Sequence, residues 1–415
     1  MQLPDKNAHA ILYLRFSGSG RMLPALCVIL MATGGAAFLY GIASPYPQAA
    51  WQAYMVNFLF WTGLAFGAIL FVAIMNLTHA RWSRPIKRLA EAPAAFLPVL
   101  LLLFVIMYGG RDALFPWLHE PAEGKTFWLN VDFLFVRNAV GLLLLMTVSL
   151  ALLYQSVRGD SEAAAGAHAR APVLHKRWRR QIALSPALGI LYAFVLSLLA
   201  FDFIMSLDPH WYSTLFGAYY FIGSFYTALA ALVILTAAIR RTPGMEHYLS
   251  DRLLHDLGKL LFGFCCMTGY LFYVQFLVIW YGNLPEETRY IILRIRTSPW
   301  EPLAWAVLAL IFIIPFVALL SRKIKSRPGI MALLGSLILI GMWLERYLLI
   351  APSLMKGRIS SPGMTEGLIS AGFLGAMALT VILFLRTFPL LPVSDPLFCE
   401  TFITASPAET ERTGP

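Results

Sequence analysis

Ten long apolar stretches constrain the fold of this chain more than any other feature of its sequence. A helix needs about 20 apolar residues to cross the hydrocarbon core of a membrane. Of the 415 residues, 59% are hydrophobic and only 13% are charged, which is too apolar for a soluble domain. The sequence therefore predicts an all-α integral membrane protein with ten transmembrane helices. The predicted spans are Met22–Ile42, Trp51–Leu77, Ala92–Tyr108, Val131–Val157, Leu184–Ser206, Ser213–Ile239, Leu253–Tyr281, Trp300–Leu320, Gly329–Ile350 and Glu366–Phe388.

Lysine and arginine cluster in alternate connections between these spans. The clusters are ARWSRPIKR (80–88), HKRWRR (175–180), IRR (239–241) and SRKIKSR (321–327). Because cytoplasmic loops are enriched in these residues, the clustering predicts that both termini are cytoplasmic. An even number of spans also requires both termini on one side. The same loops account for the net charge of +10, so we expect no nucleic-acid partner.

Two pairs of spans resemble each other. Spans two and six begin with aromatic-rich segments, and spans five and nine each carry an acid seven residues before a proline. These are Asp202 with Pro209 and Glu345 with Pro352, and each proline is expected to end its helix. The matches predict two four-helix bundles, residues 51–206 and 207–350. The peripheral spans are then 22–50 and 351–388, between a cytoplasmic N-terminal segment (1–21) and a cytoplasmic C-terminal tail (389–415).

Ionisable side chains inside the spans are candidates for a functional site, because each costs several kcal/mol unless it is paired, protonated or hydrated. Those of the outer half are Asp132, Arg137, Asp202, Glu345 and Arg346. Arg137 lies about 10 Å below the outer end of its helix and is within reach of Asp202 or Glu345. These residues are interpreted either as ion pairs that hold helices together or as the outer part of a proton path.

Polar residues nearer the cytoplasm extend this hypothesis. His79, His255 and Asp256 are candidates for the inner mouth of a proton path, and equally for residues at the membrane surface. Between the two groups, span seven offers four candidate relay residues, which are also ordinary packing residues: Thr268, Tyr270, Tyr273 and Gln275.

Ligands for a redox group are not apparent in the sequence. None of the eight histidines lies near the middle of a predicted span, as the haem of a membrane cytochrome b requires. The four cysteines form no CxxC pair, and no motif indicates a flavin, nucleotide or zinc site. We therefore expect no directly bound metal or cofactor, and any redox centres are expected in partner subunits.

Three motifs give the chain a resemblance to a known family. They are FDFIMSLDPHWYSTLFGAYYFIGSF (201–225), QFLVIWYGNLPEETRYI (275–291) and GMWLERYLLIAPSL (341–354). The chain resembles the ActF-like membrane subunits of bacterial alternative complex III, a quinol:electron acceptor oxidoreductase. The wider family is NrfD, the polysulfide reductase membrane subunit. The resemblance covers nearly the whole chain from residue 80 onward.

This resemblance implies a subunit of the bacterial plasma membrane that carries no redox cofactor and serves a respiratory or photosynthetic complex with an acceptor such as cytochrome c. The implied partners are a paralogous NrfD-like membrane subunit, an iron–sulfur and molybdopterin-like subunit, haem c subunits and membrane lipid. The resemblance adds Asp208 and His210 to the outer candidates for a proton path. The loop that contains them is expected to place Trp211 at the membrane interface.

Three other functions stay open at this stage. A quinol site in the outer half would use His210, Asp208 or Glu345 as proton acceptor. A purely structural scaffold would need the ion pairs for packing alone. A secondary transporter is disfavoured, because transporters break helices near the middle of the membrane and the matched prolines here lie near helix ends.

Overall fold

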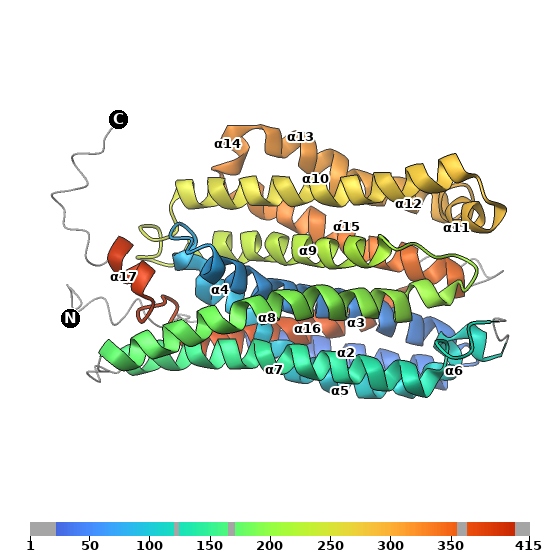
Figure 1. The fold of residues 1–415 in the computed structure, drawn as a ribbon, viewed down its shortest axis with the longest axis horizontal. Helices are drawn as coiled ribbons and strands as arrows, with labels where there is room; N and C mark the ends of the chain where they lie inside the picture. Colours follow the sequence, from blue (N-terminus) through green and yellow to red (C-terminus); the bar gives the residue numbers. More distant parts are fainter. Residues whose placement is uncertain (1–21, 120–123, 165–170, 355–362, 403–415) are drawn as a thin grey trace.

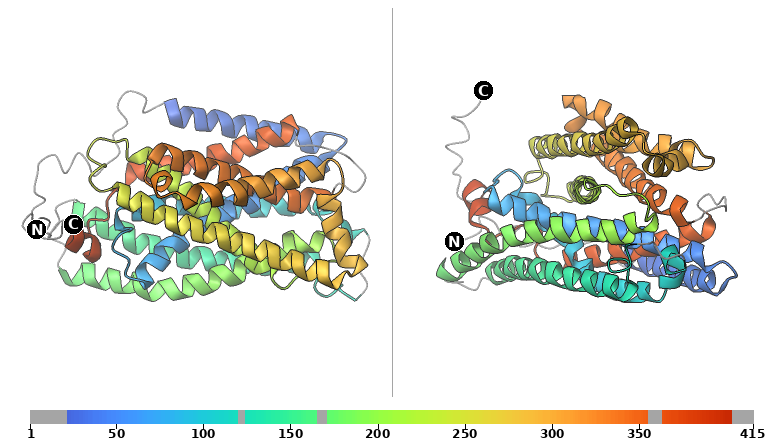
Figure 2. Two further views of the ribbon diagram at one scale, coloured as in Figure 1. Left: turned by 90° about the horizontal axis from the view of Figure 1, so that it is seen from above. Right: turned by 45° about the vertical axis from the view of Figure 1, so that its right-hand side comes forward.

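A computed structural model describes residues 22–119, 124–164, 171–354 and 363–402. Over these residues the chain is all-helical, and ten helical segments are long and apolar enough to cross a membrane, as predicted. They lie side by side along the long axis of the molecule (Figures 1 and 2). The main helices are α2 (Met22–Ala43), α3 (Pro47–Leu77), α5 (Leu97–Tyr108), α7 (Val131–Ala164), α8 (Ala171–Phe203), α9 (Phe216–Ile239), α10 (Asp251–Gly282), α12 (Trp300–Leu308) with α13 (Ile314–Leu320), α15 (Pro328–Leu354) and α16 (Met364–Thr387).

Shorter helices connect the main ones. Before α5 come η1 (Arg84–Ile86), α4 (Lys87–Glu91) and η2 (Ala92–Phe96), and after it α6 (Arg111–Leu114) and η3 (Pro116–Leu118). Further connections are η4 (Met205–Leu207), α11 (Pro285–Ile295), the π-helical turn η5 (Ala309–Ile313), α14 (Arg322–Lys325) and α17 (Pro396–Phe402). We call the end of the molecule with Asp202 and Glu345 the outer end, and the end with Arg84 and α17 the inner end, following the predicted orientation.

The core is centred on α3, which is buried along nearly its whole length and packs against α9. A helix that is apolar on all sides is stable only when other helices surround it. Small residues allow the two helices to approach closely. A Cβ added at Gly63 would lie 2.4 Å from the Ser224 hydroxyl, and one at Gly67 would lie 2.9 Å from the Ala228 Cβ.

The other helices pack around this central pair. Helices α5, α7 and α8 contact one another or α3, while α10, α12, α13 and α15 contact one another or α9. The first and last spans, α2 and α16, pack together. Contacts of α9 with both α3 and α8 join all of these helices into one continuous core. The division into two bundles therefore stays a prediction.

The third span differs from its prediction. The prediction began at Ala92 and assigned ARWSRPIKR (80–88) to an inner loop, but the segment from Arg84 onward is helical and its three basic side chains, Arg84, Lys87 and Arg88, are buried. The C-terminal segment after α16 also folds back onto the inner end, with α17 at the left of Figure 1. Part of the predicted tail is therefore packed against the core, whereas residues 403–415 lie outside the described residues.

Candidate functional site

Asp202, near the outer end of α8, is fully buried and is bound by side chains of α7. Arg137 donates hydrogen bonds to both carboxylate oxygens, from Nε at 2.7 Å and from Nη2 at 2.5 Å. Asn138 donates a third from Nδ2 at 2.5 Å. The Arg137 guanidinium also lies 3.9 Å from the centre of the Trp128 ring. Bidentate arginine–carboxylate pairs are among the stronger polar contacts in proteins, so Asp202 firmly joins α8 to α7.

Glu345 and Arg346, adjacent on α15, are each 2% exposed but are bound differently. Glu345 Oε2 lies 2.8 Å from Arg346 Nη1, yet neither carboxylate oxygen accepts a hydrogen bond of acceptable geometry from the described residues. Arg346 Nη2 donates to the Tyr220 carbonyl at 3.3 Å, and its guanidinium lies 4.2 Å from the Tyr220 ring centre. The Tyr219 side chain faces Glu345. Arg137 therefore pairs with Asp202, whereas the polar neighbours of Glu345 are Arg346 and the facing Tyr219.

A further buried cation at the outer end, Arg294 of α11, was not among the predicted site residues. Its Nε donates to the Leu348 carbonyl at 3.2 Å and its Nη2 to the Leu349 carbonyl at 2.8 Å. Pro352 lies inside α15 and has no N–H, so the Leu348 carbonyl lacks its usual helical partner. Arg294 supplies that missing donor. The helix continues past Pro352 to Leu354, and the predicted helix end at this proline is wrong.

The loop after α8 is covered by α11. The Trp211 ring stacks on Tyr290 with 3.8 Å between the ring centres, and Trp211 is 3% exposed. It was predicted to lie at the membrane interface, but this stacking buries it. In the same loop Asp208 is partly exposed and His210 is exposed. Neither belongs to the ion pairs of Asp202 or Glu345.

The remaining predicted outer and relay residues do not converge on one site. Asp132 is exposed and accepts a hydrogen bond from the Tyr108 hydroxyl at 2.8 Å. On α10, Thr268 is buried, but Tyr270 and Tyr273 are each 58% exposed on the outside of the protein. Gln275 accepts a hydrogen bond from the Ser213 hydroxyl at 3.2 Å. These four relay candidates therefore face different surroundings.

The predicted inner residues are also separate in the structure. His79 is exposed just after α3, with a φ of 50°. His255 and Asp256 are partly buried on α10, and Asp256 accepts a hydrogen bond from Lys259 at 2.9 Å. No contact within the described residues joins His79 to the other two.

Instead, six charged side chains at the inner end are each at most 2% exposed. We call them the inner charge network: Arg84, Lys87, Arg88, Glu91, Asp160 and Asp395. Arg84 Nη1 and Lys87 Nζ donate to Asp395 Oδ2 at 3.1 and 2.9 Å. Arg88 pairs with both Glu91 and Asp160. Three cations thus meet three carboxylates, which keeps the buried charges compensated. In the sequence, the lone acid in the apolar run PLLPVSDPLF (389–398) was the available signal for this network.

Comparison with known families identifies the family of this chain. Residues 42–356 match the family described as polysulphide reductase, NrfD. The chain belongs to the NrfD family. No curated protein matches it significantly. As an NrfD-family protein, it is an integral membrane subunit of the kind linked to electron transport.

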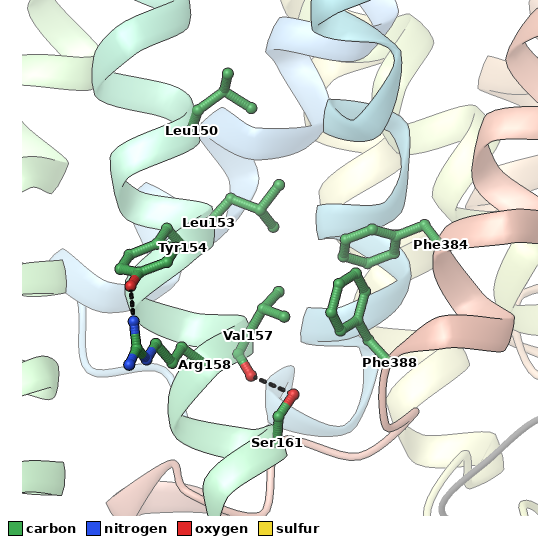
Figure 3. A pocket seen from close by; sticks show the side chains of 8 residues that line it. All are labelled: Leu150, Leu153, Tyr154, Val157, Arg158, Ser161, Phe384 and Phe388. Atoms are coloured by element: carbon green, nitrogen blue, oxygen red, sulfur yellow. Dashed lines mark hydrogen bonds between the residues drawn. The ribbon is translucent and has the colours of Figure 1, made fainter.

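Two of the cavities in the described part of this NrfD-family protein lie away from the outer acids. One is an apolar groove of about 420 Å³ between α7 and α16, lined by residues such as Leu153, Val157 and Phe384, with Arg158 at its rim (Figure 3). The other, of about 520 Å³, lies beside the basic residues of α8 between His175 and Arg180. Neither cavity is lined by an outer acid. A quinol bound in either one would therefore not contact a predicted proton acceptor. Among the described residues no three His, Cys, Asp or Glu side chains are placed to hold a metal ion.

Proposed function

We propose that this NrfD-family protein is the ActF-like membrane subunit of an alternative complex III in the bacterial plasma membrane. In this role it anchors a quinol:electron acceptor oxidoreductase and conducts protons through its buried acids. The family match and the three motifs at 201–225, 275–291 and 341–354 support the proposal. The partners would be the paralogous NrfD-like subunit, the iron–sulfur and molybdopterin-like subunit and the haem c subunits.

The observation that carries the proton-conducting role is the contrast between the two outer acids. Asp202 accepts three side-chain hydrogen bonds, so protonating it would break a tight cluster. Glu345 is similarly buried, but neither of its oxygens accepts a hydrogen bond within the geometric limits from the described residues. Burial disfavours the charged form of a carboxyl group and each accepted hydrogen bond favours it, so protonating Glu345 would break fewer contacts than protonating Asp202. We therefore assign proton transfer to Glu345, with Arg346 beside it, and a structural role to Asp202.

At the inner end we assign the same role to the inner charge network, in preference to His79, His255 and Asp256. Glu91 Oε1 and the Ser156 hydroxyl are buried and face each other, and neither makes a hydrogen bond within the geometric limits among the described residues. Ionisable groups inside a membrane protein commonly mark proton routes. The inner charge network also lies at the end of the molecule opposite Glu345. The two sites would therefore form the inner and outer halves of one proton path. The matched places of Asp202 and Glu345 further support two related bundles, with both termini in the cytoplasm.

The test is the Glu345→Gln variant in the purified complex, reconstituted in vesicles and assayed for quinol turnover and proton release. We expect full assembly and turnover near that of the parent, with proton release reduced at least tenfold. Asp132→Asn, which changes an exposed acid at the same end, is the matched control and should behave as the parent.

Two other outcomes would redirect the proposal. Normal proton release in Glu345→Gln would remove Glu345 from the path and favour a structural scaffold. Loss of quinol turnover in an intact complex would favour the second candidate, a quinol site in the outer half.

A further inference from the structure

The segment after α16, residues 389–402, crosses the inner end of the protein, and we call it the C-terminal strap (Figure 1). Its apolar residues Leu390, Leu391 and Phe398 are at most 4% exposed. We propose that the C-terminal strap is a lid over the inner charge network, held shut by Asp395, and that its opening admits water to the network.

One carboxylate fixes the strap in two ways. Asp395 Oδ2 accepts hydrogen bonds from the buried side chains of Arg84 and Lys87. Its Oδ1 accepts the backbone N–H groups of Leu397 and Phe398, at 3.1 and 3.4 Å, where α17 begins. Asp395 therefore caps the helix of the strap and neutralises two cations of the core at once.

Two more contacts attach the strap to the same network. Ser394 donates to Asp160 Oδ1 from its backbone N at 2.7 Å and from its hydroxyl at 2.5 Å. Arg88 Nε donates to the Pro389 carbonyl at 3.0 Å. All three cations of the inner charge network thus contact the strap. Without the strap, Arg84 and Lys87 would keep no carboxylate partner within ion-pair distance among the described residues.

The far edge of the strap is attached more weakly. The Phe398 and Phe402 rings lie 6.0 and 6.1 Å from the ring of Tyr248, in the loop between α9 and α10. The pair of Arg81 and Glu400 is well exposed, and exposed ion pairs contribute little. The buried contacts of the strap therefore lie between Pro389 and Phe398, and its exposed ion pair lies beyond them at Glu400.

Groups that water would bind lie in the network that the strap covers. Glu91 lies near Arg88 and Asp160, and the Ser156 hydroxyl faces it. Glu91 Oε1 and the Ser156 hydroxyl are buried, and neither makes a hydrogen bond within the geometric limits among the described residues. Opening the strap would hydrate these atoms, because buried polar groups without a partner are costly. This inference rests on the proposed function only for its consequence, which is control of proton entry at the inner end.

The first test measures water access at residue 156. A Ser156→Cys variant of the whole complex is placed in nanodiscs and treated with a water-soluble maleimide, and labelling is quantified on the peptide that contains residue 156. We expect slow labelling in this parent and at least tenfold faster labelling when Asp395→Asn is added. Glu400→Gln, in the exposed pair of the same strap, is the control and should leave the rate unchanged. Equal rates with and without Asp395→Asn, or fast labelling in the parent, would overturn the inference.

The second test needs no substitution and covers the case in which Asp395→Asn fails to assemble. Hydrogen exchange in the unmodified complex should show amides of residues 84–91 exchanging no faster than those of 394–402, since the lid must open first. Faster exchange in 84–91 would overturn the lid. Neither readout uses quinol or proton release, so the lid and the proposed function can fail independently.

Discussion

At the scale of single residues, the pair of Arg137 and Asp202 shows that a charge buried within the membrane needs a charged partner. Arg137→Gln would remove two of the three side-chain hydrogen bonds that the buried Asp202 carboxylate accepts from the described residues, leaving the one from Asn138. Removing one partner of a buried pair costs roughly 3–5 kcal/mol. We expect a loss of that size in the free energy of unfolding, measured by titration with a denaturing detergent. Asp132→Asn should change it by less than about 0.5 kcal/mol, as exposed substitutions do. Equal losses in the two variants would contradict this account.

At the scale of helices, the eighth span shows how a proline is accommodated inside the membrane. Pro315 has no N–H, so the carbonyl of Ile311 loses its helical donor and the chain forms the π-helical turn η5. The Tyr226 hydroxyl of α9 donates to this carbonyl at 3.1 Å, and the Cys265 thiol lies 3.6 Å from it. Side chains of neighbouring helices thus restore the lost hydrogen bond.

This repair makes Tyr226 a stabilising residue of the helix packing. Tyr226→Phe should lower the free energy of unfolding by about 1–3 kcal/mol, since it leaves a buried carbonyl without its hydroxyl donor. The same detergent titration measures it. Tyr270→Phe, which removes an exposed hydroxyl from α10, is the control and should have no measurable effect. A neutral Tyr226→Phe would mean that the thiol alone satisfies the carbonyl.

At the scale of the whole molecule, the strap makes stability depend on pH through Asp395. Burial alone would raise the pKa of Asp395, but the Lys87 ammonium and the Arg84 guanidinium hold it below its ordinary value. A lowered pKa contributes stability above the unfolded value of about 3.9, and that stability is lost as the pH falls through the folded pKa. The thiol of Cys399 also faces this group, but burial raises its pKa to about 11, so it stays neutral in this range.

We therefore expect the strap to stay attached from pH 7 down to about pH 5 and to loosen below about pH 4. Cleavage of the strap by a protease that is active from pH 4 to pH 7, followed across this range, measures the change. Asp395→Asn should remove this dependence and be cleaved readily throughout. Strap cleavage that rises between pH 7 and pH 6 in the unmodified protein would point to another titrating group.

The ten spans could be predicted from the amino-acid sequence, because apolar length is a local property that each segment carries alone. The sequence also limited the partner of Arg137 to Asp202 or Glu345, since helix geometry fixes how deep each residue lies in its span, and the structure shows that it is Asp202. Which charges are buried became clear only in the folded chain. Lys87 and Arg88 carry the same charge as Arg179 and Arg180, yet the first two are enclosed and the second two are exposed. The difference lies in Asp160 and Asp395, which are distant in the sequence and contact ARWSRPIKR (80–88) only once the chain has folded. These two cations can stay buried because carboxylates of this kind pair with them.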